Sequence, residues 1–439
     1  MKPNLIPVVY LVYREILSSV IPSQVLTPLE ELRGVASVSL GLMTPPGILL
    51  RTKYRPALNM IASRCREKGI DVGWLPSPPT RFPWLWSDEF VLRQWISKRF
   101  QREQPFIVRC RSARMTAIAI RALRSFPQAR VIYDCRGAEV SEAIQVQEMQ
   151  ETPESQWPKS ARNAIESIRE QERISVEESA GVTCVSNAMI HMLQNRYPKA
   201  NITKFRLVPC CTRVDSFSQA ILKRDDFRRE LGLHNKFIVT YLGSLAWFHL
   251  PDQMMRLFRI IQTLVPNAHF LAITTDPVKM QCAVEQAGFG SGEVTIRSVP
   301  PLEVPRWLVT SDLGLCLLKN NERDRVCSPL KIAEYFSAGV PVVVTPQQGD
   351  YSDIVVARKI GVQIDVAHDD DLLRETLREF LNAIATNPIQ LRHRCAQYAE
   401  RELSWSGVIP RLVEWYRELL ESPLTSPSIL SSSNAVGTP

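Results

Sequence analysis

The feature that most constrains the fold is an alternation of short apolar runs with longer amphipathic segments, which recurs in both halves of the chain. Strands that alternate with helices are typical of parallel, doubly wound sheets. The sequence therefore predicts an α/β fold with two Rossmann-like domains facing a central cleft, where the open ends of parallel strands bind ligands. The predicted strands lie at residues 6–13, 35–42, 106–110, 131–135, 182–186 and 205–208, then at 237–242, 269–274, 294–299, 313–318 and 340–345.

The domain boundary is predicted where Pro209-Cys210-Cys211 meets a charged stretch without strands. A chain of 439 residues is too long for one ordinary hydrophobic core. We assign residues 1–208 to the first domain and residues 209–421 to the second. The end of the chain, residues 422–439, is rich in Ser and Pro and is predicted to be disordered.

The basic residues are concentrated in the first half. Residues 1–210 carry 29 Lys/Arg against 19 Asp/Glu, whereas residues 211–439 carry 24 against 26. Such an excess suits an anionic substrate or a membrane surface, or it is a solvated face. No nucleic-acid partner is predicted, because the chain lacks a recognised nucleic-acid module.

Cysteine usage and hydropathy favour a cytoplasmic protein. The ten cysteines show no C-x-x-C pair and no metal-ligand spacing, so we predict free thiols and no metal site. No run of about 18 apolar residues occurs, so a membrane-spanning helix is not expected.

The most informative segment is a short helix predicted after Cys327. Ser328 suits its N-cap, Pro329 its first position and Gly339 the residue past its end. Lys331 then lies in the first turn, where a cation opposes the helix dipole unless an anion docks there. Glu334 follows three residues later on the same face, where its carboxylate could accept hydrogen bonds from two ribose hydroxyls. The alternative is a simple Lys–Glu surface pair.

The pattern Ser328-Pro329-x-Lys331-x-x-Glu334-Tyr335, followed by Gly339-x-Pro341, resembles the donor-binding signature of retaining GT-B glycosyltransferases of family 4, the glycosyltransferase group 1 domain. Further matches follow the same order over roughly residues 200–420, and the first half matches more loosely at residues 133–137 and 185–186. The resemblance implies a GT-B architecture with a nucleoside diphosphate sugar as co-substrate and no metal. These other matches lie at residues 208–215, 241–244, 294–299, 311–315, 349–350, 404–405 and 416.

The resemblance also implies roles for single residues. Glu334 would hold the donor ribose, while Lys331 and the backbone near Ser328 and Pro329 would hold the diphosphate. Gly243 and Ser244 would let the backbone approach the phosphates.

Three departures from the family pattern stand out. Val326 occupies the position of a second glutamate, the loop after Gly243 lacks an arginine and a lysine, and the first half has no match for a catalytic-region histidine. Arg325 or Lys331 could supply the missing cation.

In the first domain Arg109-x-Arg111 and Arg136-Gly137 end predicted strands and are expected to point into the cleft. These arginines are candidates for acceptor recognition or for stabilising charge on the leaving diphosphate, and Asp134 and Glu139 are candidates for orienting the acceptor hydroxyl. Structural salt bridging is the alternative.

Trp74, Trp84, Trp86 and Trp95 interleave with prolines and basic residues. This composition suits the interface of an anionic membrane on its inner face, or an ordinary core.

The favoured function is retaining transfer of a sugar from a nucleoside diphosphate sugar to a hydroxyl of a glycan or lipid-linked acceptor. Family habit suggests surface polysaccharide or glycoconjugate assembly. The departures keep two alternatives open: a non-catalytic GT-B homologue acting as a binding or scaffold subunit, and a sugar-nucleotide epimerase.

Overall fold

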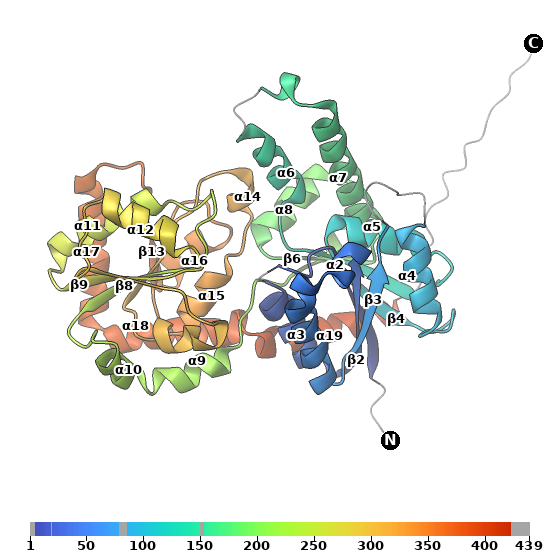
Figure 1. Cartoon of the computed structure of the whole chain (residues 1–439), viewed down its shortest axis with the longest axis horizontal. Helices are drawn as coiled ribbons and strands as arrows, with labels where there is room; N and C mark the ends of the chain where they lie inside the picture. The colour runs from blue at the N-terminus through green and yellow to red at the C-terminus, as the bar shows by residue number, and fades with distance from the viewer. Residues whose placement is uncertain (1–4, 19, 79–85, 150–152, 423–439) are drawn as a thin grey trace, which may run out of the picture.

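The computed structural model describes residues 5–18, 20–78, 86–149 and 153–422. It consists of two lobes, each built on a parallel sheet flanked by helices (Figure 1). The first sheet has seven strands in the order β3-β2-β1-β4-β5-β6-β7. Its strands are β1 (Ile6–Tyr13), β2 (Ala36–Thr44), β3 (Asp71–Pro76), β4 (Phe106–Arg111), β5 (Ala129–Cys135), β6 (Gly181–Cys184) and β7 (Phe205–Leu207).

The second sheet has six strands in the order β10-β9-β8-β11-β12-β13. The two-domain α/β prediction is thus confirmed, although β3 and β13 were not predicted. In each sheet the strand order reverses once, between β1 and β4 and between β8 and β11, and such switch points are where open α/β sheets bind ligands. The strands are β8 (Phe237–Leu242), β9 (Ala268–Ile273), β10 (Val294–Arg297), β11 (Leu313–Cys316), β12 (Val342–Val344) and β13 (Gly361–Gln363).

Helices cover both faces of each sheet. Those of the first half are α1 (Thr27–Leu32), α2 (Pro46–Leu50), α3 (Arg55–Glu67), α4 (Asp88–Ser97), α5 (Ala113–Ala122), α6 (Glu139–Glu148), α7 (Lys159–Glu178) and α8 (Asn187–Arg196). Those of the second half are α9 (Val214–Ile221), α10 (Arg224–Glu230), α11 (Pro251–Leu264), α12 (Pro277–Gln286), α13 (Val304–Leu308), α14 (Glu322–Arg325), α15 (Leu330–Ser337), α16 (Tyr351–Ala357), α17 (Asp370–Thr386), α18 (Pro388–Glu402) and α19 (Trp405–Glu421). Shorter 3-10 and π turns are η1 (Pro22–Leu26), η2 (Thr52–Tyr54), η3 (Glu154–Gln156), η4 (Ile202–Lys204) and η5 (Pro301–Glu303).

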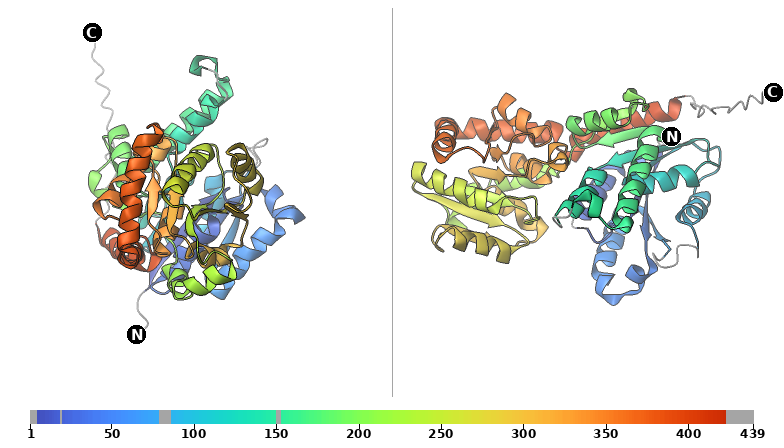
Figure 2. Two further views of the ribbon diagram at one scale, coloured as in Figure 1. Left: turned by 90° about the vertical axis from the view of Figure 1, so that its left-hand side faces the viewer. Right: turned by 90° about the horizontal axis from the view of Figure 1, so that it is seen from above.

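The last helix corrects the predicted domain boundary. The sequence assigns α19 to the second domain, yet its Trp405 and Tyr416 pack in the apolar cluster of the first domain. Arg130 of the first domain also donates to the carbonyl of Leu419 at 2.9 Å. The chain passes into the first lobe at α19 (Figures 1 and 2), where the apolar stripe of this helix is buried in the first domain's apolar cluster.

The carboxyl ends of the two sheets face each other. The Ser186 hydroxyl, just after β6, donates to the carbonyl of Val326 at 2.7 Å. The Asp350 carboxylate accepts from the backbone N–H of Asn187 at 2.7 Å, at the start of α8. The strand ends that bind ligands in doubly wound folds therefore border one cleft.

Two of the predicted membrane tryptophans belong to the core. Trp74 and Trp95 pack against the apolar clusters of the first domain, and a Cβ on Gly73 would lie 2.1 Å from the Trp95 ring nitrogen. Trp84 and residues 423–439 lie outside the described residues. None of the helices in the described part of the chain is both long and apolar enough to cross a bilayer.

Candidate functional site

The helix α15 begins one residue later than predicted. Pro329 is its N-cap residue and no side chain caps it, so the prediction of Ser328 as the cap is wrong. The Ser328 hydroxyl instead accepts the backbone N–H of Cys210 at 3.1 Å, in the segment that joins the domains. The predicted end of the helix is confirmed, because Gly339 follows it with a φ of +70°.

Tyr335 fixes α15 against the second sheet. Its buried hydroxyl donates to the carbonyl of Thr240 at 2.9 Å, and a Cβ on Gly314 would lie 2.8 Å from its ring. Ile332 and Phe336 are fully buried on the same side. Lys331 and Glu334 remain partly exposed near the helix start, where unpaired backbone N–H groups attract anions.

Lys331 reaches the loop that follows β8. Its ammonium lies 4.3 Å from the centre of the Tyr241 ring and its Nζ lies 3.1 Å from Nε2 of His249. A Cβ on Gly243, whose φ is +118°, would lie 3.4 Å from Lys331 Nζ. The structure therefore brings together Gly243 and Lys331, which the sequence placed at the phosphates, and adds His249.

His249 and Lys331 present two donors to one point. The His249 Nδ1 accepts the N–H of Ala246 at 3.1 Å, so the neutral ring carries its proton on Nε2. Burial, together with the nearby charges of Lys331 and Arg323, lowers the pKa of His249 to about 2, so the ring stays neutral. Burial also lowers the pKa of Lys331. An anionic oxygen within hydrogen-bond distance of both nitrogens would accept from both donors and offset the desolvation of the ammonium.

Glu334 lies one helical turn from Lys331 in an apolar setting. Burial raises the pKa of its carboxyl to about 7, and Lys331 is the charged group that opposes this shift. A carboxyl whose pKa is shifted toward 7 beside a cation is typical of functional positions. Its neighbourhood suits a carboxylate that accepts hydrogen bonds from sugar hydroxyls.

Two other predicted donor residues lie apart from this cluster. Ser244 is exposed, and it contributes its carbonyl to the Tyr241 hydroxyl. Arg325 is exposed and donates to the Asn320 side chain at 2.7 Å rather than joining Lys331.

The position of the second glutamate is closed by apolar packing. Val326 is 5% exposed and belongs to an apolar cluster formed otherwise by first-domain residues. The carboxylates nearby do not replace it: Glu322 pairs with Arg196 at 2.9 Å and Asp324 pairs with Arg323 at 2.6 Å.

The expectation that Arg109 points into the cleft is wrong, and Asp134 is buried beside it. They form an ion pair at 2.6 Å and are 2% and 1% exposed. The Tyr10 and Thr183 hydroxyls both donate hydrogen bonds to the Asp134 carboxylate. The pKa of Asp134 lies below its usual range, because Arg109 and Arg136 outweigh the desolvation that raises it. Both residues lie on the sheet face covered by α19, so they support the fold.

Arg136 also differs from its prediction. Its guanidinium donates to the carbonyl of Val208 at 3.0 Å and to the Gln24 side chain at 2.9 Å. Val208 begins the segment between the domains, so Arg136 anchors this segment to the first domain.

Glu139 emerges as the first-domain carboxyl beside the strand ends. It accepts the backbone N–H of Ala113 at 2.8 Å, and burial raises its pKa to about 7. It begins α6, which contacts the donor side: Glu142 of α6 pairs with Arg323 at 3.2 Å. Arg323 in turn stacks 3.7 Å from the centre of the Phe248 ring, next to His249. The loop after β8 and the first domain are thus linked across the cleft.

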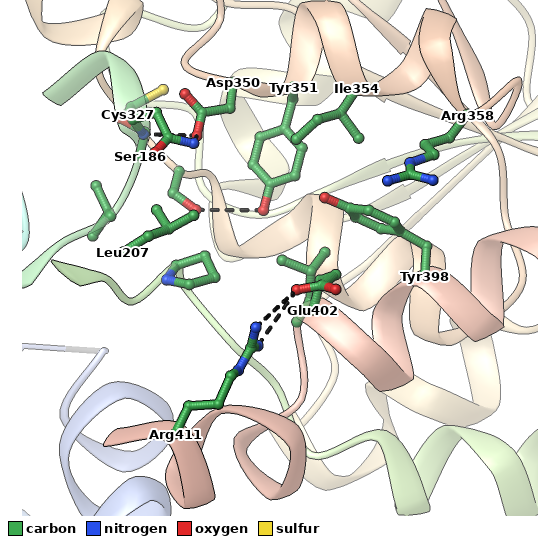
Figure 3. A pocket seen from close by; sticks show the side chains of 15 residues that line it. Ser186, Leu207, Cys327, Asp350, Tyr351, Ile354, Arg358, Tyr398, Glu402 and Arg411 are labelled. Atoms are coloured by element: carbon green, nitrogen blue, oxygen red, sulfur yellow. Dashed lines mark hydrogen bonds and ion pairs between the residues drawn. The ribbon is translucent and has the colours of Figure 1, made fainter. Parts of the chain in front are cut away.

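A pocket of about 250 Å³ lies beside the connection between the domains (Figure 3). Ser186 and Leu207 line it from the first domain, and Tyr351 and Tyr398 line it from the second. Arg411 and Glu402 pair at its mouth at 3.3 Å. The pocket is not the donor site, because neither Lys331 nor Glu334 lines it.

A comparison with known protein families indicates the class of protein. Residues 223–402 match the family model of the glycosyl transferases group 1, so the chain carries a glycosyltransferase domain of this group. This stretch contains Gly243, His249, Lys331 and Glu334. The fold is that of solved GT-B glycosyltransferases, and the matched domain supports a glycosyltransferase.

Known proteins resemble the chain over most of its length. The spore coat protein SA of Bacillus subtilis (strain 168) is 22% identical over 275 residues, which cover 56% of this chain and 67% of that protein. A glycosyltransferase from Rickettsia africae ESF-5 superposes with a TM-score of 0.65 at 13% identity, covering 96% of this chain and 100% of that one. Anabaena Alr3699/HepE in complex with UDP gives 0.63 at 12% identity, covering 94% and 100%. The lipopolysaccharide glycosyltransferase WaaG gives 0.61 at 14% identity, covering 95% and 100%.

Sequence reasoning missed His249 and Arg323. His249 closes the loop that begins at Gly243, and that position was a usable signal. Arg323 gave none, because its contacts with Phe248 and Glu142 join residues of different domains.

Proposed function

We propose that the protein transfers a sugar, with retention of configuration, from a nucleoside diphosphate sugar to an acceptor hydroxyl. The observation that carries this proposal is the convergence of Lys331, His249 and Glu334 at the switch point of the second sheet. Lys331 and His249 would hold the diphosphate, and Glu334 would hold the ribose. Retention is supported by the resemblance of residues 328–341 to the donor signature of retaining enzymes.

In this reaction the bond between the anomeric carbon and the diphosphate oxygen breaks, and the acceptor oxygen bonds to the same face of the sugar. The acceptor proton passes to the leaving diphosphate, so no pair of glycosidase-like carboxylates is needed. The protein contributes positioning and stabilisation of the leaving charge. The ammonium of Lys331 supplies that charge, so we expect turnover without a metal.

A uridine nucleotide is the first candidate donor, because the similar HepE structures contain UDP, UDP with glucose, and UDP-glucose. For the acceptor we propose a glycan or a lipid-linked molecule in glycoconjugate or surface polysaccharide assembly. Residues 51–136 carry 18 Lys/Arg against 6 Asp/Glu, which favours peripheral contact with the inner face of an anionic membrane.

The test is to incubate the purified full-length chain with a panel of uridine, guanosine and adenosine diphosphate sugars, with and without EDTA. Release of the nucleoside diphosphate identifies the donor, and NMR of the product shows its anomeric configuration. Glu334→Gln should lose turnover, whereas the exposed Glu379→Gln should keep it. An inverted product would reject retention, and turnover by Glu334→Gln equal to that of wild type would remove Glu334 from the site.

A non-catalytic homologue is the second candidate, and Val326 favours it. A buried valine occupies the position of a family glutamate and packs on the first domain. This alternative predicts tight nucleotide binding with no release of diphosphate from any sugar nucleotide. Replacing Val326 by Glu would then not create activity, because the side chain is enclosed by first-domain residues.

A further inference from the structure

Three arginines gather at the switch point of the first sheet, apart from the donor-side residues Lys331, His249 and Glu334. Arg14 follows β1, Arg111 ends β4 and Arg114 lies in the first turn of α5. Val12 of β1 pairs with Arg111 of β4, so these three residues border the same crevice between the two strands. In open α/β sheets this crevice is where ligands bind.

Two of these guanidiniums share one aromatic ring. Arg14 lies 5.0 Å and Arg114 lies 4.6 Å from the centre of the Tyr13 ring. Among the described residues, Arg14 donates to two neutral oxygens, the Ser77 hydroxyl and the Pro78 carbonyl, both at 2.9 Å. Arg114 is exposed.

The carboxylates near this cluster have partners. Glu15 pairs with Arg111 Nε at 2.8 Å, one oxygen of Asp88 accepts the Tyr13 hydroxyl at 3.3 Å, and Glu139 accepts the Ala113 N–H. Within the described part of this cluster, Arg14 Nε and Arg111 Nη1 are buried donors without a hydrogen-bond partner, against one unpaired acceptor, Asp88 Oδ1, and Arg111 is 8% exposed. Buried, unpaired donors are costly, so the site is incomplete without an acceptor-rich ligand.

We propose that the crevice between β1 and β4 binds a phosphate group of the sugar acceptor through Arg14, Arg111 and Arg114. A phosphate offers several charged oxygens, which match forked guanidinium donors better than a neutral glycan does. Its description as part of an acceptor depends on the proposed glycosyl transfer, whereas the phosphate binding itself does not.

The full-length chain, saturated with UDP to fill the donor site, is titrated calorimetrically with glucose 6-phosphate and farnesyl phosphate. Glucose and farnesol serve as the neutral counterparts. We expect the phosphate compounds to bind at least about tenfold more tightly than these counterparts, and Arg114→Gln to weaken them by about tenfold. A preference for farnesyl phosphate indicates a lipid-linked acceptor, and a preference for glucose 6-phosphate a soluble one.

The matched control is Arg124→Gln, an exposed arginine just past α5, which should bind phosphate like wild type. The Arg111→Lys variant tests the buried arginine, because lysine keeps a positive charge beside Glu15 but lacks the second hydrogen-bonding nitrogen of a guanidinium. Equal binding of the neutral compounds, or an equal loss in Arg124→Gln, would overturn the phosphate site. If UDP does not bind, the titrations are made on Lys331→Ala; a phosphate signal there keeps the site while the uridine donor is rejected, and the proposed transferase function fails only if no sugar nucleotide of the panel is turned over.

Discussion

Cationic side chains lie near the switch points of both sheets, but their surroundings differ. Between β8 and β11, Lys331 meets neutral His249 and the Tyr241 ring. On the first sheet, Arg109 of β4 is neutralised by Asp134, and both residues are buried. A charged residue at a strand end becomes a candidate site only where the fold does not enclose it with a buried counter-ion.

Arg109 and Arg111 show this contrast within one strand. They lie two residues apart on β4 and on the same face. Arg109 pairs with the buried Asp134 under α19, whereas Arg111 pairs with Glu15, whose side chain is 37% exposed. Depth in the domain, rather than residue type, separates the structural residue from the binding candidate.

The largest expected effect is on folding. Asp134→Ala removes the partner of a buried guanidinium, and breaking a buried ion pair costs about 3–5 kcal/mol. We expect a markedly lower denaturation midpoint in urea, with Glu379→Gln unchanged. A variant that unfolds like wild type but loses transfer would place Asp134 in the chemistry and erase the contrast between the two crevices.

The second effect is on donor binding. Glu334→Gln removes a charged acceptor, and hydrogen bonds to charged groups contribute about 1.5–3 kcal/mol, so UDP affinity should fall by about tenfold or more. Stability should hold, because a carboxylate desolvated on folding is replaced by a neutral amide. Calorimetry with UDP measures the first and thermal unfolding the second. Unaltered UDP affinity would show that the Glu334 side chain does not contribute to nucleotide binding.

The pH dependence sharpens the same point. The Glu334 pKa is raised to about 7, so its folded form holds a proton that the unfolded form releases near pH 4.5. Its contribution to stability is therefore greatest at low pH and declines as pH rises through 7. Ribose binding needs the carboxylate, so UDP affinity should rise about fivefold to tenfold from pH 6 to 8. This rise should be smaller in Glu334→Gln, where only the nucleotide's own titration remains. Equal slopes in the two proteins would contradict the assignment.

Lys331→Ala tests the open cation directly. The variant should be no less stable, because a desolvated ammonium near the start of α15 opposes the helix dipole. Its UDP affinity should fall by about fivefold, as expected for one charge-assisted contact. The control is Lys199→Ala, at an exposed position in the first domain. A lower melting temperature with normal UDP binding would make Lys331 structural.

The smallest effect concerns the membrane. Each basic residue near an anionic surface adds about 1 kcal/mol within roughly a Debye length. We expect binding to anionic liposomes that weakens with salt, and much less to neutral ones. Replacing both Trp84 and Trp86 by Ala should reduce it modestly. Equal sedimentation with both kinds of vesicle would point to a soluble acceptor.

Much of the fold could be read from the chain. The apolar runs at residues 6–13 and 237–242 became central strands, since a strand buried on both faces is apolar throughout. β13 was missed because it is three residues long and only its first residue is buried. α19 was placed in the wrong domain, since an amphipathic stripe does not state which core it covers.

The donor site was predictable in part, because Lys331 and Glu334 are one helical turn apart and their relation is local. The sequence by itself determined the doubly wound class, the end of α15 at Gly339 and the pairing of a cation with a carboxylate on its first turns. Only the tertiary structure decided that His249 joins Lys331, that Val326 is enclosed, and that Arg109 pairs with the buried Asp134 while Arg111 pairs with the partly exposed Glu15. Local spacing fixes which side chains share a helix face, but burial and hydrogen-bond partners depend on segments far apart in the chain, and these decide whether a charge is neutralised or free to bind.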